Sequence, residues 1–281
     1  MARMTQLQIL PEAGAATLLR ALFKGPVAAG APEIPRTAFR LERLDNRQIK
    51  RYNALLGFAA DALPLSFYYL PTQRAHLATM LGAEFPFRLA GMIHVENEIR
   101  ELRAPDRDRA MEIVTNVTIE PPAENGARYC ELHTMGKQQE QDIFECRSRY
   151  LAVRGKRRTA GGERGSAAVA PAAGQPAGEW SLAANAGRQY ASVSGDWNPI
   201  HLWPWSARLL GMKTPIIHGM HTVAKAAAML EQRESRRLKA ITARFKAPIP
   251  LGAAAELRLL EPAGSYQVWT GGTLAVEGRF G

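Results

Sequence analysis

The stretch SVSGDWNPIHLWPWSARLLG, residues 192–211, places an aspartate, an asparagine and a histidine on one short turn. Gly195 can adopt backbone torsions that other residues avoid, and Pro199 fixes its own φ and disfavours a helix at the residue before it. Such a turn can direct Asp196 and His201 into one space. Because a carboxylate and an imidazole around one water molecule form a general acid–base pair, this turn is the first candidate for a catalytic site.

Two interpretations of the turn are open from the sequence. In the first, Asp196 and His201 carry chemistry, and the neighbouring Asn198 and Ser194 hold the carboxylate or contact a substrate. In the second, the turn is structural: Asp196 caps a helix that begins near Pro204, and His201 is a core residue whose hydrogen bonds are satisfied.

The strongest predicted helix, residues 219–238, begins shortly after this turn and contains no glycine or proline after its first residue. The N–H of Gly219 would then stand at a helix N-terminus, where it can bind negative charge that develops on an oxygen atom. The alternative role for Gly219 is close packing of the helix. We expect His218 and His221 to be packing or surface residues. We expect no metal site, because no third ligand has the spacing of a zinc site.

The chain is basic, with 36 lysines and arginines against 26 aspartates and glutamates and a formal net charge of +10. A nucleic acid, an anionic surface or a phosphate-bearing small molecule could account for this charge. No zinc-knuckle, helix-turn-helix or aromatic RNA-binding pattern is present, so we expect no nucleic-acid partner. Arg244 and Lys246 are candidates for contact with an anionic group, and the alternative is that they are solvated charges on a strand.

Membrane and secretory signals are absent from the sequence. No apolar run reaches the roughly 18 residues of a membrane span, and the N-terminal stretch lacks the features of a secretory signal. Two cysteines, Cys130 and Cys146, do not make a disulfide framework, although they could face each other across a hairpin. We therefore expect a cytoplasmic protein.

One break in composition divides the chain. Residues 155–178 consist of glycine, alanine, proline and charged residues without a hydrophobic period, which predicts a flexible linker. Residues 1–154 and 179–281 are then two domains.

The two halves echo each other, which indicates an internal repeat. Where the second half has Asp196 and His201, the first has Asp61 and Ser66, so the first copy lacks the histidine and we expect its site to be silent. Further along, Gly91-Met92 in the first half matches Gly219-Met220, the start of the strong helix in the second half. Few residues separate Gly91 from the next matching segment, residues 102–105, so we expect the central helix of the first half to be short or absent.

Strand-like alternation with glycine-containing turns occupies residues 133–153 and 255–278. Each half is therefore expected to be α+β, an antiparallel sheet with a helix laid against it.

At this point the sequence resembles a known family. SGDWNPIH, residues 194–201, followed by ARLLGMKTPIIHGM, residues 207–220, is similar to the signature of MaoC-like acyl dehydratases, which include the (R)-specific enoyl-CoA hydratases and adopt the hotdog fold. ARFKAPIPLG, residues 243–252, resembles the strand that usually follows the central helix. One departure is Trp203, because family members often carry an aspartate at this position, and the difference bears on substrate specificity.

The resemblance implies a double hotdog, with two antiparallel sheets that each wrap a helix. Residues 179–281 would form the catalytic domain, and residues 1–154 a degenerate copy with a shortened central helix that widens the acyl pocket. It also implies reversible addition of water across the C2=C3 bond of a trans-2-enoyl thioester to give an (R)-3-hydroxyacyl thioester. Asp196 and His201 would hold the catalytic water, and the N–H of Gly219 would bind the thioester carbonyl. No redox or metal cofactor is required.

The acyl group would be carried by coenzyme A or by an acyl carrier protein, and the chain's positive charge would attract phosphates or an acidic face. Two other functions remain as alternatives: a hotdog thioesterase and a non-catalytic subunit that binds acyl thioesters. A monomer and a homodimer are both compatible with two hotdogs in one chain.

Overall fold

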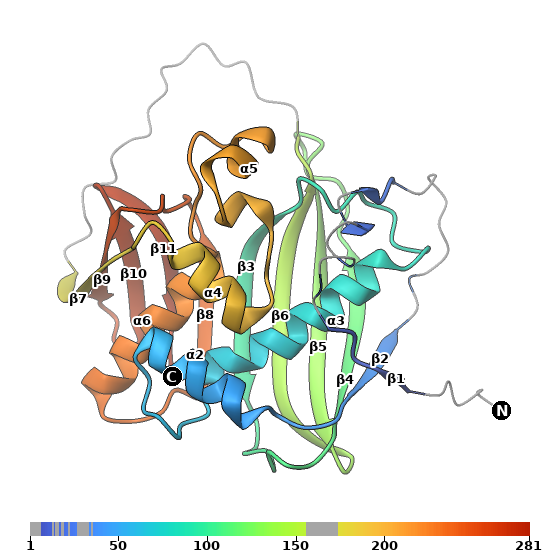
Figure 1. Ribbon diagram of the computed structural model, residues 1–281, viewed down its shortest axis with the longest axis horizontal. Helices are drawn as coiled ribbons and strands as arrows, with labels where there is room; N and C mark the ends of the chain where they lie inside the picture. The colour runs from blue at the N-terminus through green and yellow to red at the C-terminus, as the bar shows by residue number, and fades with distance from the viewer. Residues whose placement is uncertain are drawn as a thin grey trace.

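The computed structural model (Figure 1) describes residues 7–12, 14, 17, 20, 21, 23–26, 34, 36–155 and 174–281. In this part of the chain, eleven strands form one continuous sheet, and the long helices lie across one face of it. The apolar core fills the space between the sheet and these helices.

The fully described elements of the first half are six strands, two α-helices and a 3₁₀ turn. In chain order these are β1 (Gln8–Ile9), β2 (Thr37–Leu41), α2 (Asn46–Leu56), η1 (Leu65–Tyr68), α3 (Tyr69–Leu81), β3 (Ile93–Glu101), β4 (Met111–Ile119), β5 (Arg128–Gln138) and β6 (Gln141–Val153).

From β2 onward, the second half repeats this plan with one added helix. Its elements are β7 (Gln175–Ser181), α4 (Ala186–Ser194), η2 (Pro199–His201), α5 (Pro204–Leu209), α6 (Gly219–Glu234), β8 (Ala240–Phe245), β9 (Ala254–Leu260), β10 (Ser265–Thr270) and β11 (Thr273–Arg279).

The strands are ordered β1-β2-β4-β5-β6-β3-β8-β11-β10-β9-β7, and every neighbouring pair is antiparallel except β1–β2. The two halves meet where β3 pairs with β8, in a register that sets Glu96 opposite Arg244 and Arg100 opposite Ala240. The expected pair of separate sheets is therefore corrected to one shared sheet. Without the β3–β8 pairing, each of these strands would be the edge of a sheet and would expose a row of backbone donors and acceptors. The pairing removes both edges.

The helices of the two halves share a single core. Tyr52 of α2 packs against Tyr190 of α4 with ring centroids 6.4 Å apart, and both side chains are buried. The alanine-rich face of α6 is buried, as its sequence predicts, and small side chains let this helix lie close to its neighbours.

Local sequence predictions are largely confirmed. Helix α6 begins at Gly219 but ends at Glu234, four residues early, because Ser235 takes the left-handed conformation (φ 52°). The expected hairpin is β5–β6, with Gln139 and Glu140 at positive φ in its turn. Both cysteines lie in this hairpin as buried free thiols.

The repeat is visible in the order of the elements. Helices α2 and α4 each end at a left-handed glycine, Gly57 and Gly195, and each is followed by a 3₁₀ turn, a central helix and four strands. The expectation of a short or absent central helix after Gly91 is corrected: the chain there forms β3, and the first half has its central helix earlier, as α3. Helix α3 has 13 residues and α6 has 16.

The sequence concealed α3 because the helix is buried on most of its surface, so its apolar residues show no helical period. It also carries Pro71 in its first turn, where proline is tolerated. The second half alone inserts α5 between its 3₁₀ turn and its central helix, and this insertion misaligned the later echoes.

Residues 156–173 of the expected linker lie outside the described residues, and residues 175–178 belong to β7, which pairs with β9. Among the helices of the described ranges, none has the length and apolar character that crossing a membrane requires.

Candidate active site

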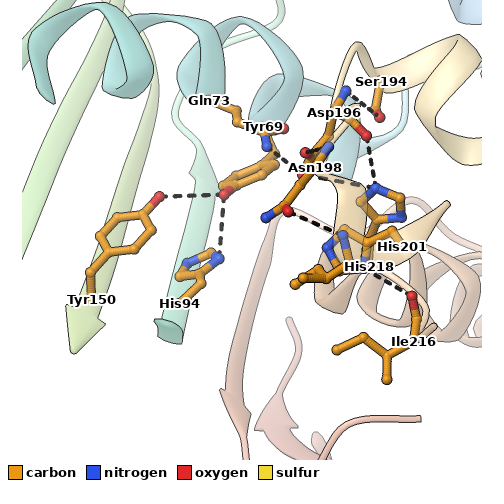
Figure 2. Close-up of polar contacts among 11 residues, drawn as sticks. Tyr69, Gln73, His94, Tyr150, Ser194, Asp196, Asn198, His201, Ile216 and His218 are labelled. Carbon is orange, nitrogen blue, oxygen red and sulfur yellow. Dashed lines mark hydrogen bonds and ion pairs between the residues drawn. The ribbon is translucent and has the colours of Figure 1, made fainter. Parts of the chain in front are cut away.

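The turn at Asp196 is built by the end of α4 (Figure 2). Gly195 ends this helix with φ 80°, and the next residue's N–H then donates to Ser194 Oγ at 3.1 Å. The Asp196 carboxylate accepts a hydrogen bond from the backbone N–H of Asn198 at 3.1 Å through Oδ1. Helix α5 begins at Pro204 without a side-chain cap, so the expectation that Asp196 caps it is wrong.

His201 is fixed in position and tautomer by the backbone around it. Its Nδ1 lies 2.8 Å from the carbonyl oxygen of Ile216, and because a carbonyl only accepts, Nδ1 carries the proton. The lone pair of this ring is therefore on Nε2. Asn198 Oδ1 accepts from the N–H of Ile200 at 3.3 Å and so caps the 3₁₀ turn η2 that presents His201.

Close packing of α4 against η2 sets the position of His201. A Cβ added to Gly187 would lie 1.9 Å from the His201 carbonyl oxygen, so only glycine allows this approach. Arg188, the next residue in α4, donates to the carbonyl of Leu202 at 2.8 Å. The helix therefore holds the end of the turn that carries the histidine.

His218 is buried within the site, rather than at the surface. It precedes α6 as its N-cap residue, and its ring stacks on His201 with centroids 3.8 Å apart. Its Nε2 donates to the backbone carbonyl of Asp196 at 2.9 Å and lies 4.0 Å from Oδ2 of the same residue. Helix α6 is thereby joined directly to the turn.

Asp196, His201 and His218 each offer one ligand atom within 4.8 Å of the others. This is the one such group of three or more in the described part of the chain, and sequence spacing gave no sign of it. Two histidine nitrogens of the group already donate to backbone carbonyls, so His201 Nε2, His218 Nδ1 and the remaining lone pairs of the carboxylate are the acceptors of this group. A water hydrogen-bonded to two atoms at about 2.8 Å each can bridge such a separation.

Protonation follows from burial and from the hydrogen bonds. Burial, and after it the neighbouring His218 ring, lower the pKa of His201 to about 3 despite the opposing effects of Asp196 and the Ile216 carbonyl, so the imidazole is neutral near pH 7. Burial raises the pKa of Asp196, but the His218 and His201 rings and hydrogen bonds from Gln73 and the Asn198 N–H outweigh it and hold that pKa below its usual value. The site therefore contains a carboxylate and a neutral imidazole.

Gly219 is the first residue of α6, so its N–H stands at the helix N-terminus as predicted. A Cβ at this position would lie 2.7 Å from the Phe245 ring of β8. The glycine is therefore also required for close packing, which is compatible with a role for its N–H.

The structure does not bring Arg244 and Lys246 to this site. In β8, Ile241 and Ala243 enter the core, whereas Arg244 lies on the outer face of the sheet, with Nε 3.7 Å from Glu96. Lys246 pairs with Glu277 at 2.8 Å. Strand alternation explains the outcome, since residues of opposite parity face opposite sides of a sheet.

One site residue that sequence reasoning missed comes from the first half. Gln73 of α3 donates from Nε2 to Asp196 Oδ2 at 2.7 Å. It lies 123 positions away in the chain and belongs to no motif, so no sequence signal could have identified it.

The fold and the site together define a class of protein. Two successive copies of a sheet that covers a central helix, merged into one sheet, form an α+β double hotdog, and a carboxylate–imidazole pair stands at the start of the second central helix. The class is that of double hotdog proteins with a carboxylate and an imidazole close together in one site. Residues 175–265 match the MaoC like domain family, which confirms the resemblance seen in the sequence.

Known proteins resemble the chain over most of its length. It is 27% identical over 277 residues to 3-hydroxyacyl-thioester dehydratase X of Mycobacterium tuberculosis, with 91% of each chain covered. The crystal structure of HtdX from that organism superimposes with a TM-score of 0.70 at 24% identity, covering 86% of this chain and 98% of that one. A second M. tuberculosis structure, described as a double hotdog fold, gives a TM-score of 0.57 at 12% identity, covering 90% and 98%.

Proposed function

We propose that this chain is a 3-hydroxyacyl-thioester dehydratase, which catalyses the reversible hydration of a trans-2-enoyl thioester to an (R)-3-hydroxyacyl thioester. The observation that carries the proposal is the Asp196–His201 pair, whose polar atoms lie within 4.8 Å of each other at the N-terminus of α6. The similarity to 3-hydroxyacyl-thioester dehydratase X over 91% of the chain supports the substrate class.

In the hydration direction, a water bound between Asp196 and His201 loses a proton to the pair as its oxygen attacks C3. Both groups are ready to accept, because the carboxylate is ionised and His201 Nε2 carries a lone pair. Electrons move onto the thioester oxygen, where the N–H of Gly219 and the α6 dipole stabilise the negative charge. The pair then returns the proton to C2, so that one water supplies both new bonds.

Ser194 and Asn198 act in this proposal by holding the turn, since their side chains bond to the backbone of Asp196 and Ile200. The acyl group is carried by coenzyme A or by an acyl carrier protein. Because Arg244 and Lys246 face away from the site, a contact of these residues with the carrier would take place on the outer face of the sheet.

The test is hydration of a short and a long trans-2-enoyl-CoA, followed by the loss of absorbance of the conjugated thioester. Removing a well-placed acid–base group costs roughly 10² to 10⁴ in rate, so Asp196→Asn and His201→Ala should each lose turnover by about that factor. Asp61→Asn is the matched control, because Asp61 stands at the corresponding place before η1 and is exposed. It should keep wild-type activity.

Two results would contradict the proposal. Release of free coenzyme A without hydration would identify a thioesterase. Turnover that persists in both Asp196→Asn and His201→Ala would remove the pair from the reaction.

A further inference from the structure

The silent first half reaches into the site of the second half through one side chain. Helix α3 crosses the sheet beside the turn that carries Asp196, and Gln73 points from it toward the carboxylate (Figure 2). The Nε2···Oδ2 distance of 2.7 Å is short for a hydrogen bond from nitrogen, as expected when the acceptor is charged. Because an ionised carboxylate only accepts, the amide nitrogen of Gln73 must face it.

We propose that Gln73 is a positioning residue for the dehydratase reaction, and that the first half completes the active site by holding the catalytic carboxylate in its working orientation. This inference rests on the proposed function. It assigns a catalytic contribution to a domain whose own copy of the site lacks the histidine.

The geometry of the carboxylate explains why a second hydrogen bond is needed. Oδ1 accepts the N–H of Asn198, which belongs to the same turn and so moves with Asp196. Gln73 bonds to Oδ2 from a different element, so the two bonds together fix the rotation of the carboxylate plane. With Oδ1 alone held, the carboxylate could swing away from His201, and misplacement of a catalytic group by about 1 Å can cost 10²-fold in rate.

Helix α3 is itself anchored, so it can serve as a rigid support. Tyr69 lies one turn before Gln73 on the same side of the helix, and its hydroxyl contacts His94 Nδ1 at 3.3 Å and the Tyr150 hydroxyl at 3.5 Å. The His94 ring stacks on Tyr150 with centroids 4.7 Å apart. These bonds to β3 and β6 hold the face of α3 that presents Gln73 (Figure 2).

Replacement of Gln73 by leucine keeps a side chain of similar size and removes the donor. Because the lost hydrogen bond is to a charged group, we expect a loss of about 10- to 100-fold in kcat. KM should change little, because Gln73 touches Asp196 and acts on the substrate only through it.

Replacement of Gln73 by glutamate gives a signature that a structural role would not produce. At pH 8 the new carboxylate repels Asp196, and activity should fall at least as far as in Gln73→Leu. At low pH the two carboxyl groups share one proton, the new side chain donates again, and activity should recover. The groups that face Asp196 and could also titrate are His201, His218, His94, Tyr69 and Tyr190. They are present in every variant and cancel in the comparison with wild type.

Gln48 of α2 offers a matched control. It is also a half-buried glutamine of the first half, and its Nε2 donates to the second half at 2.7 Å, but the acceptor is the backbone carbonyl of Val193. Gln48→Leu and Gln48→Glu should change stability as much as the Gln73 variants do and leave kcat and its pH profile unchanged.

The experiment measures kcat and KM from pH 5 to 9 for wild type and for the Gln73 and Gln48 pairs of variants, with the melting temperature of each. Loss of kcat in Gln73→Leu and acid-side recovery in Gln73→Glu, both absent from the Gln48 pair, support the inference. Active wild type with unchanged Gln73 variants, or equal losses in both pairs, would overturn it. An inactive wild type would instead refute the proposed function.

Discussion

At the scale of single residues, the site is defined by which atoms are left free to accept a proton. The carbonyl oxygen of Ile216 accepts a hydrogen bond from Nδ1–H of His201, which leaves the lone pair on Nε2. Burial is the main reason that the pKa of this ring is lowered to about 3, so the ring is neutral. Asp196 stays ionised because its hydrogen bonds and the adjacent rings outweigh the cost of its burial. Both groups therefore act from their deprotonated forms.

The pH dependence of kcat/KM follows from these directions. A base works above its own pKa, and both pKa values are lowered, so kcat/KM should stay level from about pH 8 down to about pH 5. An unperturbed histidine would instead give a decline with a midpoint near pH 6.5. The measurement is the initial hydration rate at low substrate across this range, with each sample reassayed at pH 7 to exclude unfolding. A midpoint near 6.5 would contradict a neutral, buried His201.

At the scale of elements, the site depends on how closely one helix meets one turn. Helix α4 approaches η2 so closely that a Cβ at Gly187 would lie 1.9 Å from the carbonyl oxygen of His201. Nothing in the local sequence marks Gly187 as special, because glycine within a helix ordinarily only weakens it. Glycine is required at this position because the backbone of His201 packs against it, and this contact is known only from the tertiary structure.

Gly187→Ala should therefore displace His201, since the added methyl would lie 1.9 Å from a backbone oxygen that cannot move aside alone. We expect a loss of activity of at least about 10-fold, together with about 1–3 kcal/mol of stability, the usual cost of overpacking. Chemical denaturation and initial rates would measure the two effects. Ser192→Ala, at an exposed position of the same helix, should change neither by much. Wild-type activity in Gly187→Ala would contradict the described contact.

At the scale of the whole molecule, the two halves are joined by charged groups in addition to the shared sheet. Glu101, at the end of β3, is buried and bonds to Lys239, to Arg237 at 2.9 Å and to the Tyr68 hydroxyl at 2.8 Å. Burial raises the pKa of this carboxyl, but the hydrogen bonds from Lys239 and Tyr68 and the charge of Arg237 outweigh it and hold that pKa below its usual value.

Glu101→Gln should lower the free energy of unfolding by about 1–3 kcal/mol near pH 7, because it removes charged hydrogen bonds between the halves. A depressed folded-state pKa contributes stability above the unfolded value, about 4.3, and that contribution disappears as pH falls through the folded value. The difference from wild type should therefore shrink below about pH 4. Denaturant unfolding at pH 3 to 7 would show this. Glu98→Gln, on the same strand but exposed beside Arg100, is the control and should show little effect.

The sequence by itself determined the parts of the protein whose cause is local. Turn chemistry around Gly195 and Pro199 predicted the bend at Asp196 and His201. Alanine content predicted α6, and alternation predicted the hairpin and the last three strands. The family resemblance could be recognised because the signature residues are contiguous, and the match of residues 175–265 to the family confirms it. The roles of Asp196, His201 and Gly219 stay predictions until the variants are measured.

The tertiary structure alone decided what depends on residues far apart in the chain. Helix α3 was hidden because burial on most of its surface erases the amphipathic period, and the single sheet exists because two strand edges pair across the repeat. The entry of Gln73 and His218 into the site, and the outward position of Arg244, likewise follow from packing and strand parity. A local pattern encodes how a segment bends and which face it buries, but its partners are chosen by the whole chain.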